Sequence, residues 1–206
     1  MWIIYAQGFA GNFPWNVIVY FFFGYLMTER GYDNDSVLIT MAPVILILAL
    51  GYFIGGAVGD ALFKRTARGR IIISTIGVFF GALFLYLAMT TPVDNRTQFF
   101  IYMCLTASFM PLSSPNVIAT VYDITVPEVR STAQSLEYFV ENTGAAFAPL
   151  LTGLVASQIG LSTAIIFMCL SAWAICFLLY LIGLFTVEHD VHTLRTQMAE
   201  RAKSIS

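Results

Sequence analysis

The sequence predicts an all-α integral membrane protein built from six transmembrane helices. Of the 206 residues, 58% are hydrophobic and only 11% are charged, and the mean hydropathy is +0.79; a soluble domain is about half apolar and about a quarter charged. Six mostly apolar segments each reach the roughly 20 residues that a helix needs to cross a bilayer. None of them alternates apolar and polar residues as outer-membrane strands do, and helices are the other way to pair backbone groups in hydrocarbon.

The six expected helices account for almost the whole chain and leave only short connections and a tail. They cover residues about 2–27, 37–63, 71–91, 98–122, 132–157 and 161–186. We therefore divide the chain into a transmembrane domain, residues 1–186, and a cytoplasmic amphipathic tail, residues 187–206. The apolar face of this tail, which includes Val187, Val191 and Leu194, is expected to lie against the bilayer surface.

The basic residues predict which ends of the helices face the cytoplasm. Eight of the ten Lys and Arg residues lie in the connections 64–70 and 123–131 and in the tail. The opposite connections hold only Arg30 and Arg96. Because Lys and Arg favour the cytoplasmic side, both termini are expected in the cytoplasm of a multi-pass protein of the plasma or inner membrane.

The six spans differ in polarity, and the difference predicts their positions. Spans three and six contain no charge, Asn or Gln, whereas spans one, four and five carry most of the polar residues. Polar groups at membrane depth are tolerated where they face protein or a wet cavity. We therefore expect spans three and six at the lipid-facing rim, and spans one, four and five, with part of span two, around a polar interior. The order repeats as two units of three spans, a recurring feature of secondary transporters.

Polar and aromatic residues in the middle of spans one and four are candidate substrate contacts: Asn12, Trp15, Asn16, Ser113, Ser114 and Asn116. Pro111 and Pro115 lie beside the second group. Proline leaves backbone carbonyls of a helix without donors, and such carbonyls can line a binding site. Hydrogen bonding between neighbouring helices is the alternative role for these side chains.

Glu137 and Glu141 are the only charged residues well inside a span. They are one turn apart on one face of span five, and Glu141 lies roughly 15 Å from the start of that helix, near the middle of the bilayer. An intramembrane acid is costly unless it is protonated, paired or hydrated. We expect Glu141 to bind a coupling proton or a cationic substrate, with Glu137 as a relay; the alternative is a hydrogen-bonded pair that bridges span five to spans two or four.

A loop motif connects this sequence with a known family. The residues Gly56, Asp60, Lys64 and Arg65 resemble the G-x-x-x-D-x-x-x-[RK]-[RK] signature of the major facilitator superfamily (MFS), and they join spans two and three as in that family. Ala61 and Phe63 depart from the fullest form of the motif, where arginine and glycine are usual. Such a degenerate form is typical of the C-terminal half of these proteins.

A second element supports the same resemblance. Pro127, Arg130 and Ser131 resemble the P-x-x-R-[GS] element of the corresponding loop between spans four and five. The resemblance implies one six-transmembrane-helix half of an MFS fold, with a 3+3 inverted repeat, paired with an N-terminal six-helix half or a second copy. It also implies a permease that moves a small organic solute by alternating access, as a symporter or antiporter, without a cofactor.

The resemblance assigns a cytoplasmic gate to the loop motif: Gly56, Asp60, Lys64, Arg65 and Arg130. An acid at the end of span two can face the positive N-terminal end of a neighbouring helix, and span five begins near Ser131. Arg130 is expected to extend this contact into an ion network with Asp60 or Glu128. The alternative is a static charge cluster that only sets the topology.

Other function classes fit the sequence less well. An intramembrane serine protease needs a base near its nucleophile, and no histidine lies in any span. A diaspartyl enzyme is disfavoured because Asp60 and Asp123 lie at the cytoplasmic boundary. His189 and His192 lie in the tail, where an exposed helix is expected rather than a metal site. A non-transporting membrane scaffold or receptor, or an inactive half-transporter fragment, stays open, as do organic anions, sugars, drugs and peptides as substrates.

Overall fold

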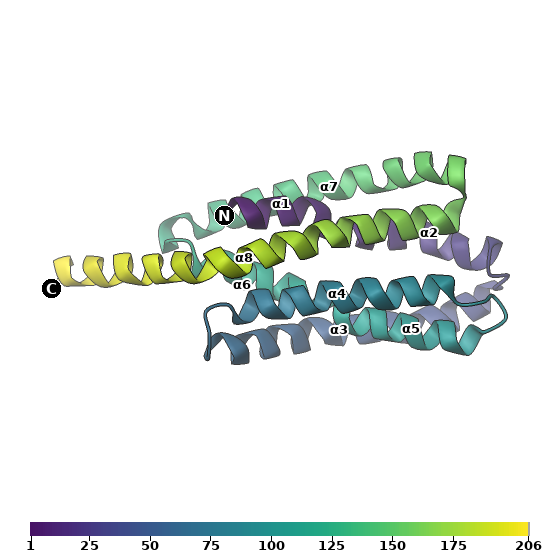
Figure 1. Ribbon diagram of the computed structural model, residues 1–206, viewed down its shortest axis with the longest axis horizontal. Helices are drawn as coiled ribbons and strands as arrows, with labels where there is room; N and C mark the ends of the chain where they lie inside the picture. The colour runs from purple at the N-terminus through teal and green to yellow at the C-terminus, as the bar shows by residue number, and fades with distance from the viewer. Residues whose placement is uncertain (206) are drawn as a thin grey trace.

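The computed structural model describes residues 1–205, which are almost entirely helical (Figure 1). The elements are α1 (Trp2–Gly11), α2 (Phe13–Thr28), α3 (Asn34–Phe63), α4 (Gly69–Thr90), α5 (Arg96–Phe109), η1 (Met110–Leu112), α6 (Ser113–Asp123), η2 (Pro127–Val129), α7 (Arg130–Ile159) and α8 (Leu161–Ile205). The helices lie roughly along one common axis, and both termini are at the same end of the bundle.

Four helical segments are long and apolar enough to cross a membrane. They are Asn34–Phe63, Gly69–Thr90, Pro127–Ile159 and Leu161–Ser204, so the class of an all-helical membrane protein is confirmed. The two other segments that we expected to span the bilayer, residues about 2–27 and 98–122, are each divided into shorter helices. The break follows Gly11 in the first segment and Phe109 in the second.

Proline contributes to both interruptions. Pro14 lies at the start of α2 and Pro111 at the start of η1. Because proline has no backbone N–H and its ring clashes with the carbonyl one turn earlier, it weakens a regular α-helix at both positions. Pro43 and Pro149 lie inside α3 and α7, which stay continuous. A proline alone therefore does not divide a span.

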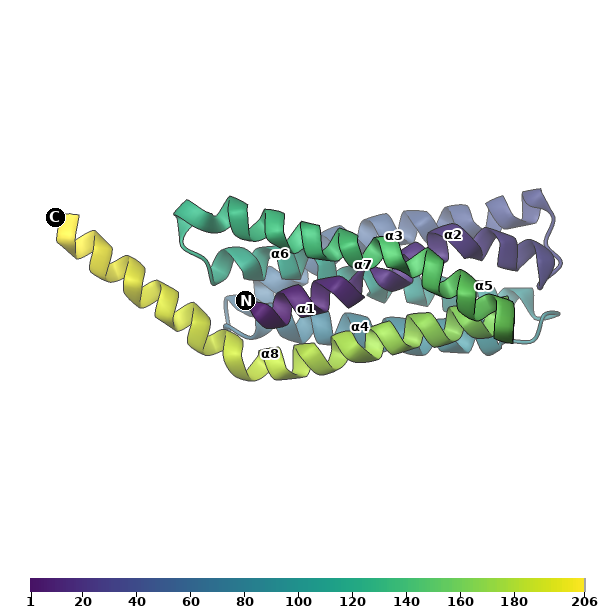
Figure 2. The same ribbon diagram turned by 90° about the horizontal axis from the view of Figure 1, so that it is seen from above.

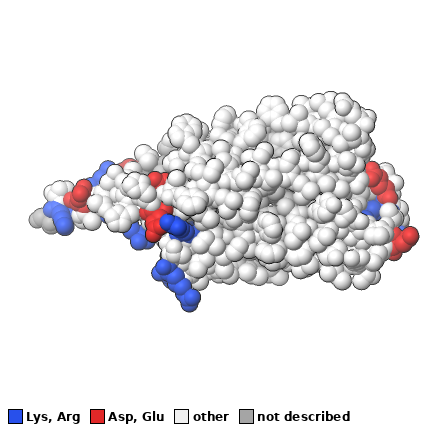
Figure 3. All heavy atoms as spheres, viewed as in Figure 1, with Lys and Arg blue, Asp and Glu red and all other residues white. Residues whose placement is uncertain are grey.

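The connections alternate between the two ends of the bundle. At one end the guanidinium of Arg30 donates hydrogen bonds to the carbonyls of Thr91 and Pro92, both at 3.1 Å, and thereby joins the α2–α3 and α4–α5 connections. At the other end Arg68, in the α3–α4 connection, pairs with Glu188 of α8 at 2.6 Å. On the face shown in Figure 3, basic and acidic side chains gather at the two ends, and a broad uncharged band lies between them.

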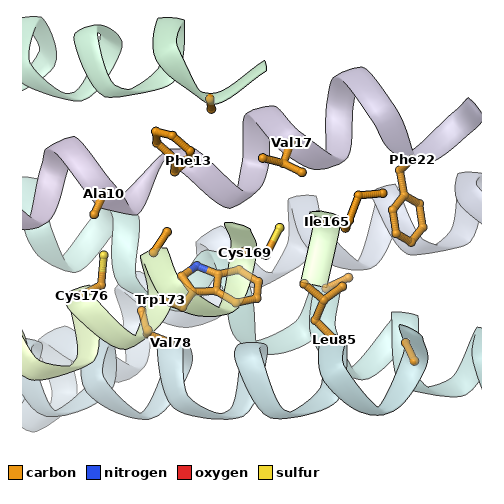
Figure 4. Close-up of a cluster of buried hydrophobic side chains, with 14 of the residues drawn as sticks. Ala10, Phe13, Val17, Phe22, Val78, Leu85, Ile165, Cys169, Trp173 and Cys176 are labelled. Atoms are coloured by element: carbon orange, nitrogen blue, oxygen red, sulfur yellow. The ribbon is translucent and has the colours of Figure 1, made fainter. Parts of the chain in front are cut away.

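The core lies where α8 packs between the first span and α4 (Figure 4). Trp173 of α8 is 3% exposed, and it lies among apolar side chains from all three segments, which include Ala10, Phe13, Val17, Val78 and Leu85. Cys169 and Cys176 of the same helix are buried, and all three cysteines of the chain are free thiols. Span six is therefore a packed element of the domain and not only a lipid-facing one.

Exposure does not follow apolarity among the spans. In the most apolar stretch of α4, 50% of the residues are buried, against 17% in α3 and 22% in α7. Phe53 of α3 and Phe139 of α7 are 79% and 70% exposed. We expected span three at the rim, yet it is packed on both sides by other helices. The reason is that an apolar side chain fits equally well against lipid and against another apolar helix.

Glycines let α3 and α4 pack closely against η1, the break between α5 and α6. A Cβ atom at Gly51 would collide with the Pro111 ring, and one at Gly55 would lie 2.7 Å from the Leu112 Cα. On the other side, a Cβ at Gly77 of α4 would lie 2.8 Å from the Phe109 carbonyl oxygen. The interruption is thus held between two helices that approach it at backbone distance.

The last helix continues well beyond the bundle. α8 runs without interruption from Leu161 to Ile205, so the tail that we separated at residue 187 is the continuation of span six. Figure 2 shows that α8 changes direction where it leaves the other helices. Val187, Val191 and Leu194 are buried against the protein. The apolar face that we expected on the bilayer surface therefore packs on the end of the bundle.

Candidate functional site

A central cavity of about 90 Å³ lies where the two divided segments face each other. Its walls come from α1 and α2 on one side and from η1 and α6 on the other, and α3, α4, α7 and α8 complete it. The peptide groups at both breaks therefore lie beside the cavity. The cavity is large enough for several water molecules or for part of a small solute.

Most of the residues predicted as substrate or proton contacts meet in this cavity. Those that line it are Asn12, Trp15, Ser113, Ser114, Glu137 and Glu141. They come from three segments that are far apart in the sequence, and only the fold brings them together. Amide, hydroxyl, carboxyl and indole groups thus share one small volume.

Asn16 and Asn116 were predicted in the same group but do not line the cavity. The Asn16 side-chain amide donates a hydrogen bond to the Asn12 carbonyl at 3.0 Å. Asn116 is 1% exposed, and its amide donates to the carbonyls of Gly55 at 2.9 Å and Leu112 at 2.8 Å. The bond from Asn116 to Gly55 is the interhelical role that we considered as the alternative, whereas the bond from Asn16 is local.

The two acids differ in their surroundings. Glu137 is 2% exposed and accepts a hydrogen bond from the Gln134 amide at 3.0 Å. A Cβ at Gly8 would lie 3.2 Å from the Glu137 carboxyl oxygen, so the backbone of α1 lies directly against this acid. Glu141 lies one turn further along α7 and borders the same cavity. No Lys, Arg or His lines the cavity in the part of the chain that the structure describes, so neither acid has a cationic partner there.

Sequence reasoning missed a tyrosine at this site. Tyr180 of α8 is 3% exposed, and its hydroxyl donates a hydrogen bond to the side-chain carbonyl of Gln7 in α1. The sulfur of Cys176, one turn earlier in α8, lies 3.6 Å from the Gln7 backbone carbonyl. Gln7 was visible as a polar residue in an apolar span. Tyr180 gave no signal, because tyrosine in an otherwise apolar helix is equally typical of packing and of membrane interfaces.

A second cluster lies at the end of the bundle that carries the termini. Arg70, at the start of α4, pairs with Asp60 of α3 at 2.8 Å and also with Asp123 at the end of α6. The side chain of Asp60 is 60% exposed, whereas those of Arg70 and Asp123 are 14% and 21% exposed. Burial raises the pKa of the Asp123 carboxyl, and the charge and hydrogen bond of Arg70 oppose that shift.

This network differs from the one that we expected around the loop motif. Asp60 pairs with Arg70 and not with Arg130, whose guanidinium donates to the Thr125 carbonyl at 3.2 Å. Lys64 and Arg65 take part in no ion pair within residues 1–205. The short α3–α4 connection is the reason, because it returns the chain to the end of α3 and places the first turn of α4 beside Asp60.

Two other expected residues have local roles. Glu128, the alternative partner for Arg130, pairs with Arg201 of α8 at 2.9 Å. Gly56 lies against α6, where an added Cβ would be 3.7 Å from the Pro115 Cβ, an ordinary contact distance. The loop motif is therefore only partly a connected unit. Arg70, which lies just after it, is the residue that joins the three helices.

The comparisons with known proteins agree with a membrane transporter. No protein-family model matches the sequence. A hexuronate transporter of Bacillus subtilis (strain 168) is 28% identical over 156 residues, which make up 72% of this chain and 37% of that protein. The chain thus spans little more than a third of the length of the curated relative that it matches.

Proposed function

We propose that this chain is the C-terminal six-helix half of an MFS secondary transporter that moves a small organic solute by alternating access. The observation that carries the proposal is the position of the two divided segments. Each segment is broken near its middle, and the two breaks border one cavity. In the proposed division into two units of three spans, each would be the first span of its unit. Discontinuous helices at corresponding positions of internal repeats commonly form the substrate site of secondary transporters.

The residues at the breaks fit recognition of a hydroxylated solute. Asn12, Ser113 and Ser114 offer amide and hydroxyl groups, and Trp15 offers a flat apolar face. Small-molecule sites combine apolar walls with a few well-placed polar groups in this way. The similar protein is a hexuronate transporter, and we propose a sugar acid or a related organic solute as the substrate. A substrate carboxylate then needs a counter-charge from the other half, because this half offers none beside the cavity.

We propose that Glu141 and Glu137 couple transport to protons. Both acids border the cavity, and neither has a basic partner there. An acid in that position is stable when it holds a proton and costly when it is charged without water. Glu141 exchanges the coupling proton and Glu137 relays it, in a symporter or an antiporter.

The ion pairs of Arg70 with Asp60 and Asp123 fit a cytoplasmic latch, by which we mean a contact that holds the cytoplasmic side of the transporter closed. Arg70 holds the ends of α3, α4 and α6 together, and the side chain of Asp60 is left largely open. We propose that this exposed acid contacts a helix N-terminus of the opposite half when the cytoplasmic side is closed. Lys64, Arg65 and Arg130 then keep this side of the protein in the cytoplasm.

The partner is a second six-helix unit, either an N-terminal half or another copy of this chain. The apolar side chains that α3 and α7 leave exposed, such as Phe53 and Phe139, provide a surface for it. Exposed apolar surface of this kind is also compatible with lipid. The proposal of a partner therefore rests mainly on the length of the similar transporter, of which the chain matches 37%.

Uptake into vesicles tests the proposed function. The chain is reconstituted together with the second six-helix unit of the transporter, an inward proton gradient is imposed, and accumulation of labelled glucuronate is followed for the native protein and for Ser113→Ala/Ser114→Ala. We expect gradient-driven uptake that the double substitution reduces by raising KM. Absence of uptake for glucuronate and for a panel of organic acids and sugars would favour a scaffold or an inactive half. Uptake by the chain alone would indicate that two copies pair.

A further inference from the structure

A second cavity lies in line with the central one, between it and the end of the molecule that carries the C-terminus. Its volume is about 250 Å³, and Ile3, Ile71, Thr120, Gly183 and Asp190 are among its lining residues. A third cavity of about 380 Å³ continues outward and shares Met1, Ile124 and Asp190 with the second. These spaces lead toward the end of the molecule that carries the C-terminus, one of the two ends where charged side chains gather in Figure 3.

Four helices, α1, α4, α6 and α8, line the central and the second cavity in succession. In α1, Gln7, Gly8 and Gly11 border the central cavity, and Trp2, Ile3 and Ile4 border the second. The corresponding residues are Val78 and Ile71 in α4, and Val117 and Thr120 in α6. In α8, Trp173 and Cys176 border the central cavity, and Gly183 and Asp190 border the second. The two cavities are therefore stacked along one axis. Tyr180 is the residue that borders both.

The hydrogen bond from Tyr180 to Gln7 lies where the two cavities meet, because Tyr180 lines both of them and Gln7 lines the central one. Tyr180 of α8 and Gln7 of α1 are 3% and 5% exposed. The distance from Tyr180 to Asp190 is ten residues of helix, or about 15 Å. Rotation of the Tyr180 phenol ring away from Gln7 would join the central cavity to the second one, over a path of about that length.

We propose that Tyr180 and Gln7 form an internal water gate that gives Glu137 access to water at the C-terminal end without separation of the two halves. Glu137 lies close enough to Tyr180 to interact electrostatically with it. With the gate open, the carboxyl of Glu137 transfers its proton to water, which leaves a carboxylate and a hydronium ion, while Tyr180 keeps its own proton. This route bypasses the substrate pathway.

The groups around the acids are compatible with proton exchange by water. The titratable groups that face Glu137 or Glu141 are Tyr5 of α1, Tyr52 of α3, Tyr138 of α7 and Tyr180 of α8, in addition to the two acids themselves. None of them is basic, so no fixed cation in this half holds the proton site in its charged form. The importance of the gate for transport rests on the proposed proton coupling. The gate itself, as a path for water, does not depend on that proposal.

Cys176 is a built-in reporter for this gate, because it borders the central cavity one turn from Tyr180. With Cys104→Ser and Cys169→Ala as background, a charged, membrane-impermeant methanethiosulfonate is added to oriented vesicles from the side of the C-terminus. We expect Tyr180→Phe and Gln7→Leu each to raise the labelling rate of Cys176 about fivefold, since each removes the same hydrogen bond. Tyr180→Ala, which also removes the ring, should raise it further.

A blocking substitution identifies the route of the reagent. Gly183 lines the second cavity, and an added Cβ there would lie 3.7 Å from the Ile71 side chain, so Gly183→Leu narrows the cavity without a backbone clash. We expect it to return the labelling of Tyr180→Ala to the background rate. Tyr25→Ala is the matched control, because Tyr25 is 2% exposed and borders neither cavity.

Two results would overturn the inference. Labelling of Tyr180→Ala that Gly183→Leu leaves unchanged would mean that the reagent enters through the central cavity alone. An equal rise in Tyr25→Ala would mean general loosening of the bundle. Labelling does not depend on transport, so a functioning gate in a protein without pH-dependent uptake would contradict the proposed coupling and leave the gate in place.

Discussion

The side-chain oxygen of Asn116 occupies the space beside Gly59 that any larger residue in α3 would fill. The amide nitrogen of the same side chain bonds the Gly55 carbonyl one turn earlier in α3. A polar side chain from the divided segment is therefore inserted between two glycines of its neighbour. This contact connects the start of α6 to α3, and it makes the position of the break sensitive to a single methyl group.

We predict that Gly59→Ala destabilises the protein by about 1–3 kcal/mol, because the new methyl group has no room beside Asn116. Gly56→Ala, in the same helix, should be neutral or slightly stabilising. Its Cβ would lie 3.7 Å from Pro115, an ordinary contact distance, and alanine favours the helix. Thermal unfolding in detergent measures both. Equal melting temperatures for the two variants would contradict the close contact.

Arg30 is a buried cation that is held by neutral groups. It is 2% exposed, it bonds the hydroxyl of Tyr25 and the carbonyls of Thr91 and Pro92, and its guanidinium lies 4.1 Å from the centre of the Phe99 ring. We predict that Arg30→Lys costs about 1.5–3 kcal/mol, because a lysine does not reproduce the fork of donors or the stacking. Arg96→Lys is the control for an exposed guanidinium, because Arg96 also stacks on a ring, that of Tyr32 at 4.4 Å, but makes a single exposed hydrogen bond. Denaturant unfolding compares the two.

The Arg70 network predicts that a substitution at Asp60 changes transport while it leaves the stability of the protein nearly unchanged. Because Asp60 is 60% exposed, Asp60→Asn should change stability by less than about 1 kcal/mol. If Asp60 belongs to a latch, the same variant should still slow transport severalfold and increase labelling of the cytoplasmic side. Arg65→Ala, which removes a charge outside any ion pair, should leave transport unchanged. Normal transport and labelling in Asp60→Asn would leave only a topological role for the cluster.

The two acids predict a loss of coupling without a loss of binding. We expect Glu141→Gln to abolish uptake driven by a proton gradient, while exchange of labelled for unlabelled substrate continues. Glu137→Gln should slow proton-driven uptake by about tenfold or more, as is usual when a proton-transfer group is removed. Glu29→Gln, an acid outside the cavity, is the control. Full pH-dependent uptake in Glu141→Gln would exclude the proposed proton role.

The C-terminal part of α8 should be held mainly by apolar burial. Leu194 is 8% exposed, and Leu194→Ala should cost about 2–5 kcal/mol if this part unfolds together with the bundle. The Arg68–Glu188 pair is 43% and 54% exposed, so its coupling energy should stay below about 1 kcal/mol. Limited proteolysis of the tail distinguishes the two effects. Rapid cleavage in Glu188→Gln with no change in Leu194→Ala would mean that the ion pair, and not apolar burial, holds this part of α8.

Much of the fold follows from apolar length and proline. The expected spans 37–63 and 71–91 differ from Asn34–Phe63 and Gly69–Thr90 by only a few residues. Hydropathy marks where a helix can lie in a membrane. It does not say where that helix is interrupted, and Pro111 divides its segment while Pro149 does not. The difference arises from tertiary contacts, such as the glycines that close on η1.

The candidate site was predictable in its composition and less so in its partners. Polar residues inside spans were a correct guide to Asn12, Ser113, Glu137 and Glu141 as cavity residues. The same rule selected Asn116, whose amide is used up in joining two helices. It overlooked Tyr180, because a tyrosine in an apolar helix carries no distinguishing pattern. Which polar group meets which is set by distance in the fold and not by spacing in the sequence.

The single-residue connection between α7 and α8 affects how the protein is made. α7 ends at Ile159 and α8 begins at Leu161, with Gly160 between them at a φ of 85°. One residue reaches only about 3.5 Å, so the finished helices α7 and α8 form a tight helical hairpin. We expect the two spans to enter the membrane during synthesis as one unit. A side chain that hinders the left-handed turn at Gly160 would then impair biogenesis before it affected the finished protein.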